Sequence, residues 1–203
     1  MAFKQTIKKI WHFIWEEDSI WSWLVNLALA FILIKFIVYP GLGLLLGTSF
    51  PVVAVVSGSM EHDGSFDEWF QSPAYCGSFC SQEEWYAFYS ITEEEFKEFS
   101  FKNGFNKGDI MVLQGIEPKN IKSGDVIVFI SREGYDPIIH RVVSITGDET
   151  TGFVYQTKGD HNSDSGDIDM EIAESSVIGK AIFRIPLLGW IKILFVEFIT
   201  LFQ

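Results

Sequence analysis

Two serines flank a glycine in the stretch VVSGSM, residues 55–60, which follows a long apolar segment. Ser57 and Ser59 could be ordinary turn residues, because serine and glycine are common in loops. A serine hydroxyl becomes a useful nucleophile only when a positioned base accepts its proton. The chain must therefore supply such a base before Ser59 can be considered a catalytic residue.

Four histidines could provide that base. His12 falls in an amphipathic N-terminal segment, and His62 is too close to Ser59 in sequence to reach back without a special turn. His161 follows an aspartate in a turn. His140 lies in IIHRVV, a run expected to be a half-buried strand, where a polar group needs partners. Taken alone, His140 is therefore better explained as a structural histidine with satisfied hydrogen bonds.

Three aspartates stand in the glycine-containing stretch TKGDHNSDSGD, residues 157–167: Asp160, Asp164 and Asp167. A carboxylate beside an imidazole fixes the tautomer of the ring and stabilises the imidazolium when it forms. By itself, this stretch is more typical of a turn or a weak Ca²⁺ site, although it lacks the spacing and the terminal glutamate of an EF-hand.

Short β-rich runs separated by glycine and charged turns would have to position these groups. No helix-length periodic segment separates the later runs, so we expect a small antiparallel β domain built from residues 50–60 and 108–185. The expected strands are residues 51–58, 110–115, 124–131, 137–145, 152–159 and 176–185.

Residues 61–107, called here the inserted lobe, differ from the β-rich runs in composition. They contain ten acidic and three basic residues. Ser81 with Glu84, and Thr92 with Glu95, match the spacing of a capping box. They predict two short helices, near residues 82–90 and 93–100. The acidity is most simply explained as a solvated face.

The two cysteines of the chain, Cys76 and Cys80, lie in the stretch CGSFC of this lobe. They could form a short disulfide outside the cytoplasm, provide half of a metal site, or remain two free thiols. No second Cys/His cluster lies nearby in sequence to complete a zinc site, so a metal is the weaker option and no metal ligands are predicted.

The N-terminal region is typical of a membrane anchor. In residues 1–17 the apolar residues lie three or four apart and the lysines lie mostly to one side, which is typical of an amphipathic interfacial helix. Residues 18–49 read as the anchor, with residues 20–39 having the length of about 20 that crosses a bilayer. Pro40, followed by glycines, is expected to break this helix. The alternatives are a helix packed on a domain and a cleaved signal peptide, but the apolar run looks too long for the latter and lacks a small-residue cleavage pattern.

Charge predicts the orientation of this anchor. Lys4, Lys8 and Lys9 should keep the N-terminus in the cytoplasm, which leaves residues beyond about 50 outside it. The net charge of −12 argues against non-specific binding to nucleic acid. The C-terminal residues 186–203 are apolar, with a helix expected to start at Pro186. We expect a second membrane-interfacial helix there, with a second crossing as the alternative.

The motifs SGSM, GDI, GDVIVF, IIHRVV and TKGD, in this order, resemble type I signal peptidases. The resemblance is to the archaeal and endoplasmic-reticulum branch, because the bacterial branch has a lysine base where this chain has His140. It covers the anchor, residues 51–60 and residues 108–189, and omits the inserted lobe. The proline that usually follows SGSM is missing, and the lobe replaces a short link. The resemblance implies a mainly β fold, signal-peptidase-like or SOS-repressor-like, with a transmembrane helix, a small α-rich insertion and a C-terminal apolar helix.

The resemblance implies Ser59 as nucleophile and His140 as general base. Asp160 matches the aspartate of KGD, and a second aspartate downstream usually completes the triad. The common spacing falls on Gly166, so a shift of one residue selects Asp167, whereas Asp164 needs a larger shift. We predict Asp167 as the third member, with Asp160 supporting the loop.

The implied function is a membrane-anchored serine endopeptidase that removes signal peptides from secretory preproteins, without a cofactor. Ser57 and the backbone N–H of Ser59 would form the oxyanion hole. Residues 51–57 would pair with the extended peptide, and Val53, Val55 and Met60 would line the groove. The partners would be preproteins and the lipid bilayer of the cell or endoplasmic-reticulum membrane, close to the translocon.

Two other classes of protein share parts of this pattern. A membrane-anchored scaffold with a silent site would use the acidic lobe as its working surface, although Ser59, His140 and Asp160 are all intact. A self-cleaving repressor of the serine–lysine type would share a related β fold. The membrane anchor and the lack of a lysine at position 140 argue against the repressor.

Overall fold

The computed structural model describes residues 2–131, 134 and 137–200. The chain divides into two compact units, Met1–Leu45 and Leu46–Gln203, which are described separately. The first unit is helical: α1 (Ala2–Trp15) is followed by α2 (Ile20–Leu33), a π-helical segment (Ile34–Val38) and α3 (Tyr39–Leu46). The Ser22 hydroxyl of α2 donates to the carbonyl of Phe13 at 2.5 Å, and the Asn26 amide donates to that of Ile14 at 2.8 Å. These two bonds satisfy carbonyls that the end of α1 leaves free.

The helix does not break at Pro40, so that prediction is wrong. Proline lacks an N–H and its ring clashes with the carbonyl four residues earlier in a regular α-helix. Here Ile34–Val38, which ends two residues before Pro40, forms a π-helical turn. The wider hydrogen-bond spacing of this turn accommodates the proline ring. The stretch Ile20–Leu46 therefore runs for 27 residues and contains an 18-residue window with a mean hydropathy of 2.2. Within the described residues it is the one helix long and apolar enough to cross a membrane.

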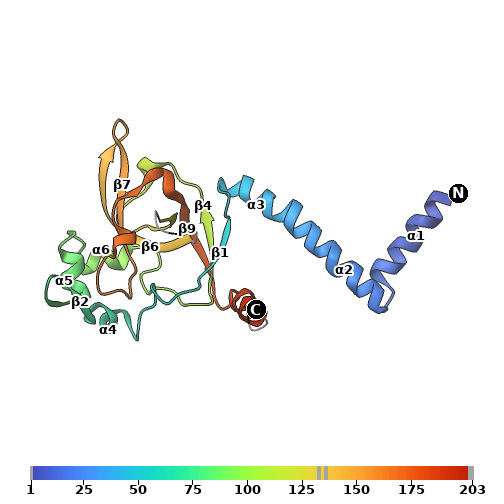
Figure 1. Cartoon of the computed structure of the whole chain (residues 1–203), viewed down its shortest axis with the longest axis horizontal. Helices are drawn as coiled ribbons and strands as arrows, with labels where there is room; N and C mark the ends of the chain where they lie inside the picture. The colour runs from blue at the N-terminus through green and yellow to red at the C-terminus, as the bar shows by residue number, and fades with distance from the viewer. Residues whose placement is uncertain (1, 132–133, 135–136, 201–203) are drawn as a thin grey trace. The chain divides into compact units, whose positions relative to one another are not determined.

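The second unit is built on a seven-stranded sheet with the order β1-β4-β9-β5-β6-β7-β8. Figure 1 labels β1, β4, β6, β7 and β9 of this sheet. All its strand pairs are antiparallel, as the sequence predicts. β1 lies at one edge and is shorter than the predicted run 51–58, while β8 is too short to have a periodic signal. The strands are β1 (Val52–Ala54), β4 (Ile110–Gln114), β5 (Val126–Ile130), β6 (Pro137–Asp148), β7 (Gly152–Lys158), β8 (Ile172–Ala173) and β9 (Val177–Ile185).

The central strand β5 is buried on both faces, which explains its unbroken apolar sequence. Because side chains alternate along a strand, Val126 and Val128 point into one core, and Ile127 and Phe129 point into another. The first core contains Met60, and the second contains Tyr155. Three short 3₁₀ helices connect strands: η2 (Pro118–Asn120), η3 (Asp167–Asp169) and η4 (Glu174–Ser176).

The inserted lobe forms its own aromatic core, which includes Val143 of strand β6. Figure 1 shows the labelled lobe elements α4, α5, α6 and β2 together at the left of the second unit. The predicted capping boxes are present, so α5 begins after Ser81 and α6 begins after Thr92, although both helices end earlier than predicted. A third capping box, not predicted, starts α4 at Ser65. Cys76 and Cys80 form a disulfide. The elements are α4 (Phe66–Phe70), β2 (Pro73–Tyr75), β3 (Phe79–Ser81), α5 (Gln82–Ala87) and α6 (Glu93–Glu98).

The C-terminal helix α7 (Trp190–Thr200) begins later than the predicted start at Pro186. Residues 186–189 form a turn instead, in which the Gly189 N–H donates to the carbonyl of Gly108 at 2.8 Å. The turn leaves most apolar side chains of α7 exposed, including Ile191 and Phe195.

Candidate active site

Ser59 lies in a tight turn that follows the edge strand β1. The Glu61 N–H donates to the carbonyl of Gly58 at 3.0 Å, and the His161 N–H donates to the carbonyl of Ser59 at 2.9 Å. These bonds fix the backbone on both sides of the serine. Its half-buried hydroxyl lies 3.0 Å from Nε2 of His140 and 3.2 Å from the hydroxyl of Ser57.

His140 is the fourth residue of β6, paired in register with Ile127 of β5, and is only 4% exposed. One ring nitrogen contacts Ser59. The other, Nδ1, lies 2.5 Å from Oδ1 of Asp169. A buried histidine in a strand needs partners for both nitrogens, and here a hydroxyl and a carboxylate supply them.

Asp169 is the last residue of η3 and is 1% exposed. Its Oδ1 also accepts from the Thr157 hydroxyl at 2.5 Å, and its Oδ2 accepts from the Gly166 N–H at 3.3 Å. These donors orient the carboxylate toward His140. A hydroxyl, an imidazole and a carboxylate thus form a continuous chain, which is the arrangement that activates a serine in acyl transfer.

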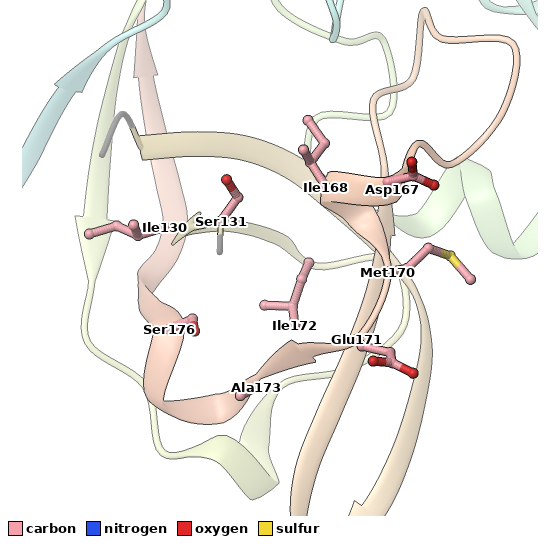
Figure 2. A pocket seen from close by; sticks show the side chains of 9 residues that line it. All are labelled: Ile130, Ser131, Asp167, Ile168, Met170, Glu171, Ile172, Ala173 and Ser176. Carbon is pink, nitrogen blue, oxygen red and sulfur yellow. The ribbon is translucent and has the colours of Figure 1, made fainter. Parts of the chain in front are cut away.

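The carboxylate beside His140 is therefore not that of Asp167, which differs from the prediction. Asp167 is exposed and lies at the rim of a cavity of about 190 Å³, together with Ile168 and Met170 (Figure 2). A 3₁₀ turn has about three residues per turn, so residues two apart point in different directions. Asp169 turns inward and Asp167 outward. The spacing of the aspartates in the sequence does not indicate that Asp169, and not Asp167, contacts His140.

Asp160 lies in a separate buried cluster next to this site. Its carboxylate accepts from Arg141 at 2.9 and 2.7 Å and from the Tyr86 hydroxyl at 3.0 Å, and it lies 3.0 Å from Nε2 of His62. Burial raises the pKa of Asp160, but the charge of Arg141 and the bonds from His62 and Arg141 outweigh it, so the pKa lies below its ordinary value. The third aspartate, Asp164, accepts from Nε1 of Trp85 at 2.9 Å.

Two buried residues near the site, His62 and Lys158, make contacts that the sequence did not predict, although His62 was considered and set aside as a candidate base. His62 stacks on Trp69 with the ring centres 3.5 Å apart. Lys158, at the end of β7, is fully buried, and its ammonium donates to Oε1 of Gln82 at 2.7 Å and to the carbonyl of Gly159 at 3.2 Å. Burial lowers the pKa of Lys158 to about 7. Nothing local in the sequence indicates these contacts, because their partners lie far away along the chain.

The predicted groove residues do not form an open surface. Val55 is 2% exposed and Met60 is fully buried, and both belong to the core that also contains Met111. Val53 packs against the same core and is half-buried. The prediction is therefore wrong for Val55 and Met60, because the strand ends at Ala54 and the following turn directs these two side chains inward.

Gly159 approaches the Ser59–His140 pair closely. A Cβ at this position would lie 2.7 Å from the carbonyl oxygen of Ser59 and 2.8 Å from Nε2 of His140. Only glycine fits here without displacing one of the two. Among the described residues, no group of three or more His, Cys, Asp or Glu side chains is arranged to hold a metal ion.

The chain is similar to catalytic subunits of signal peptidase complexes. It is 26% identical over 163 residues to "Signal peptidase complex catalytic subunit SEC11C" of Homo sapiens. This alignment covers 77% of this chain and 63% of the human protein. It is 35% identical over 102 residues to "Signal peptidase complex catalytic subunit SEC11" of Lachancea thermotolerans, covering 46% of this chain and 60% of that protein. The SEC11 protein of Eremothecium gossypii is 34% identical over 105 residues, covering 48% and 62%. No protein-family model matches the chain.

The sheet-rich unit, with an apolar helix before it and a helix after it, has the architecture of a signal peptidase. Within that class, the homologues of this chain are the SEC11 catalytic subunits of the signal peptidase complex, of the endoplasmic-reticulum type. The identity is modest and extends over most of the chain. The chain spans about 63% of the length of the SEC11C relatives that it matches.

Proposed function

We propose that this protein is a membrane-anchored serine endopeptidase that removes signal peptides from secretory preproteins. The observation that carries the proposal is the continuous contact from the Ser59 hydroxyl through His140 to Asp169, at 3.0 and 2.5 Å. The names of the SEC11 relatives supply the reaction class and the substrate. Those relatives are subunits of a complex, so we propose that this chain also works with partner subunits near the translocon.

In the proposed mechanism, the Ser59 hydroxyl attacks the carbonyl carbon of the scissile peptide bond while Nε2 of His140 accepts its proton. Asp169 stabilises the imidazolium and holds Nδ1–H in place. His140 then gives the proton to the leaving amine, which releases one product and leaves an ester on Ser59. A water molecule, deprotonated by His140, hydrolyses that ester and restores the serine. No cofactor takes part in these steps.

The oxyanion of the tetrahedral intermediate needs donors that are already in position. The Ser57 hydroxyl, 3.2 Å from that of Ser59, is the proposed side-chain donor, and the Ser59 backbone N–H is the proposed second donor. Both lie in the turn after β1, so one short segment provides the nucleophile and the groups that stabilise the charge it creates.

The peptide is proposed to bind beside β1. This strand pairs with β4 and forms one edge of the seven-stranded sheet, so its other side can accept an extended peptide by backbone pairing. Val56, which is 60% exposed and next to Ser57, replaces the buried Val55 and Met60 as the proposed side-chain contact. Substrates with small residues before the cleaved bond would fit against this surface.

The helix Ile20–Leu46 is the proposed anchor, with α1 and α7 as interfacial helices. The lysines of α1 favour a cytoplasmic N-terminus, with the β unit on the opposite side of the membrane. The Cys76–Cys80 disulfide supports that side, since disulfides persist outside the reducing cytoplasm. A signal peptide held in the bilayer would present its cleavage site on that same side.

The proposal can be tested on membranes that contain the full chain. A model preprotein with an Ala-x-Ala site should be cut by the wild type, and Ser59→Ala should cut it at a rate lower by about 10³-fold or more. Ser78→Ala, which changes an exposed serine between β2 and β3, is the matched control and should behave as wild type. An intact precursor with wild type, or equal cleavage by Ser59→Ala, would contradict the proposal.

A further inference from the structure

We propose that the inserted lobe holds the catalytic loop, residues 159–169, in its active position, and that Trp85 is a positioning residue for the reaction. This inference rests on the proposed peptidase function. It assigns a role to the inserted lobe, which the resemblance to signal peptidases omits.

The catalytic loop contacts all three members of the proposed triad. Its His161 N–H donates to the carbonyl of Ser59 at 2.9 Å. Its Gly159 packs against the Ser59 carbonyl and the His140 ring so closely that no side chain would fit. Its last residue is Asp169. A shift of this loop would therefore change the geometry of the serine, the histidine and the aspartate together.

Three consecutive residues of the loop each accept a hydrogen bond from the lobe. Nε2 of Gln82 donates to the carbonyl of Asn162 at 3.1 Å, and the Tyr75 N–H donates to the carbonyl of Ser163 at 2.9 Å. Nε1 of Trp85 donates to Oδ1 of Asp164 at 2.9 Å. These donors come from β2 and α5, both of which contribute residues to the aromatic core of the lobe.

The start of the loop is held by a second, buried set of lobe contacts. The Tyr86 hydroxyl donates to the Asp160 carboxylate at 3.0 Å, and Nε1 of Trp69 donates to the Asp160 carbonyl at 3.1 Å. Oε1 of Gln82 accepts from the Lys158 ammonium at 2.7 Å, just before the loop. Buried polar groups are costly to leave unpaired, so the loop cannot leave the lobe without a large penalty.

Outside the lobe, the middle of the loop is held by two hydrogen bonds: the His161 N–H donates to the Ser59 carbonyl at 2.9 Å, and the Ser165 hydroxyl donates to the Thr157 carbonyl at 2.7 Å. Residues 162–164, between these two bonds, have their contacts to the lobe. His161, Ser163 and Asp164 are all exposed, and the segment contains no apolar side chain between Gly159 and Gly166 that could anchor it in a core. A polar, glycine-flanked loop of this kind is ordinarily mobile. The lobe therefore supplies the order that the sequence of the loop cannot supply by itself.

The test uses Trp85→Phe in the full chain, because phenylalanine keeps an aromatic ring in the core and removes the Nε1–H donor. Phenylalanine is also smaller than the buried tryptophan, so the Asp164 variants described below separate the loss of the hydrogen bond from the loss of packing. We expect kcat for the model preprotein to fall about tenfold with KM unchanged, since a misplaced catalytic group affects the transition state. We also expect faster amide hydrogen exchange in residues 161–166. Tyr89→Phe is the matched control, because it removes a lobe hydroxyl that accepts from Gln156 of β7 and does not contact the loop.

The acceptor side provides a rescue experiment. Asp164→Ala should resemble Trp85→Phe, whereas Asp164→Asn keeps an Oδ1 acceptor and should recover most of the lost kcat. The double variant Trp85→Phe/Asp164→Ala should be no slower than the slower single variant. Each single change already removes the same hydrogen bond between Trp85 and Asp164, so the second change has no further bond to remove.

Unchanged kcat and unchanged exchange in Trp85→Phe would overturn the inference, and so would an Asp164→Asn variant as impaired as Asp164→Ala. Faster exchange with an unchanged kcat would also overturn it. If wild type does not cut the preprotein, the proposed function fails, while the exchange measurement still reports separately whether the lobe holds the loop.

Discussion

Nδ1 of His140 lies 2.5 Å from Oδ1 of Asp169, although β6 and η3 are separated by a whole strand and a loop. This contact brings the carboxylate to the side of the ring opposite Ser59. It assigns the third position of the proposed triad to a residue that the spacing of aspartates in the sequence did not select.

Replacing Asp169 should affect the rate far more than replacing Asp167. Asp169→Asn leaves a side chain of the same size but removes the charge that stabilises the imidazolium, so kcat should fall by about 10³-fold or more. Asp167→Asn changes an exposed carboxylate and should stay within about twofold of wild type. Initial rates of precursor cleavage by the two variants measure the difference, and the reverse ranking would assign the third position to Asp167.

Ser57 should contribute to kcat through its hydroxyl. Ser57→Ala removes the proposed oxyanion donor, and such donors are typically worth about 10²-fold in kcat. The side chain is exposed, so the loss of folding stability should be small. Ser57→Thr keeps the hydroxyl and should recover much of the rate. Equal rates for Ser57→Ala and wild type would exclude the hydroxyl from the oxyanion hole.

Lys158 should make stability depend on pH in the alkaline range. Burial lowers the pKa of Lys158 to about 7 in the folded protein, and its unfolded value is about 10.4. Between these values the unfolded chain binds one more proton, so the free energy of unfolding rises with pH, by up to about 1.4 kcal/mol per unit. The penalty of burying the charge is fully present below pH about 7.

The measurement is denaturant unfolding of the detergent-solubilised full chain, followed by tryptophan fluorescence between pH 7 and 10. Lys158→Met has a similar length and no charge, so the additional slope should disappear in this variant. The slope is the informative quantity, because the methionine also leaves the Gln82 oxygen without its donor. Equal slopes in both proteins would show that Lys158 titrates normally.

Local patterns predicted much of the fold. The β-rich runs that contain β5 and β7 formed strands as predicted, and the side chains of β5 alternate between two cores. The capping boxes at Ser81 and Thr92 formed because they satisfy helix N–H groups with neighbouring side chains. Each of these features depends on residues that are close in sequence.

Features that depend on distant residues were not predictable in this way. The inward turn of Asp169 depends on a 3₁₀ helix between the catalytic loop and β8, and the burial of Met60 depends on residues of β4 and β5. The continued helix at Pro40 required a π-helical turn that the sequence pattern does not indicate. The contact between Lys158 and Gln82 joins residues 76 positions apart.

The most direct test of the account is whether His140 activates the group at position 59. Ser59→Cys would introduce the one free thiol of the chain, because Cys76 and Cys80 are joined to each other. A thiol that gives its proton to an adjacent imidazole is reactive at neutral pH. The rate of alkylation by iodoacetamide at pH 7 should fall at least about tenfold when His140→Ala is added to Ser59→Cys. An equal rate with and without His140 would contradict the account.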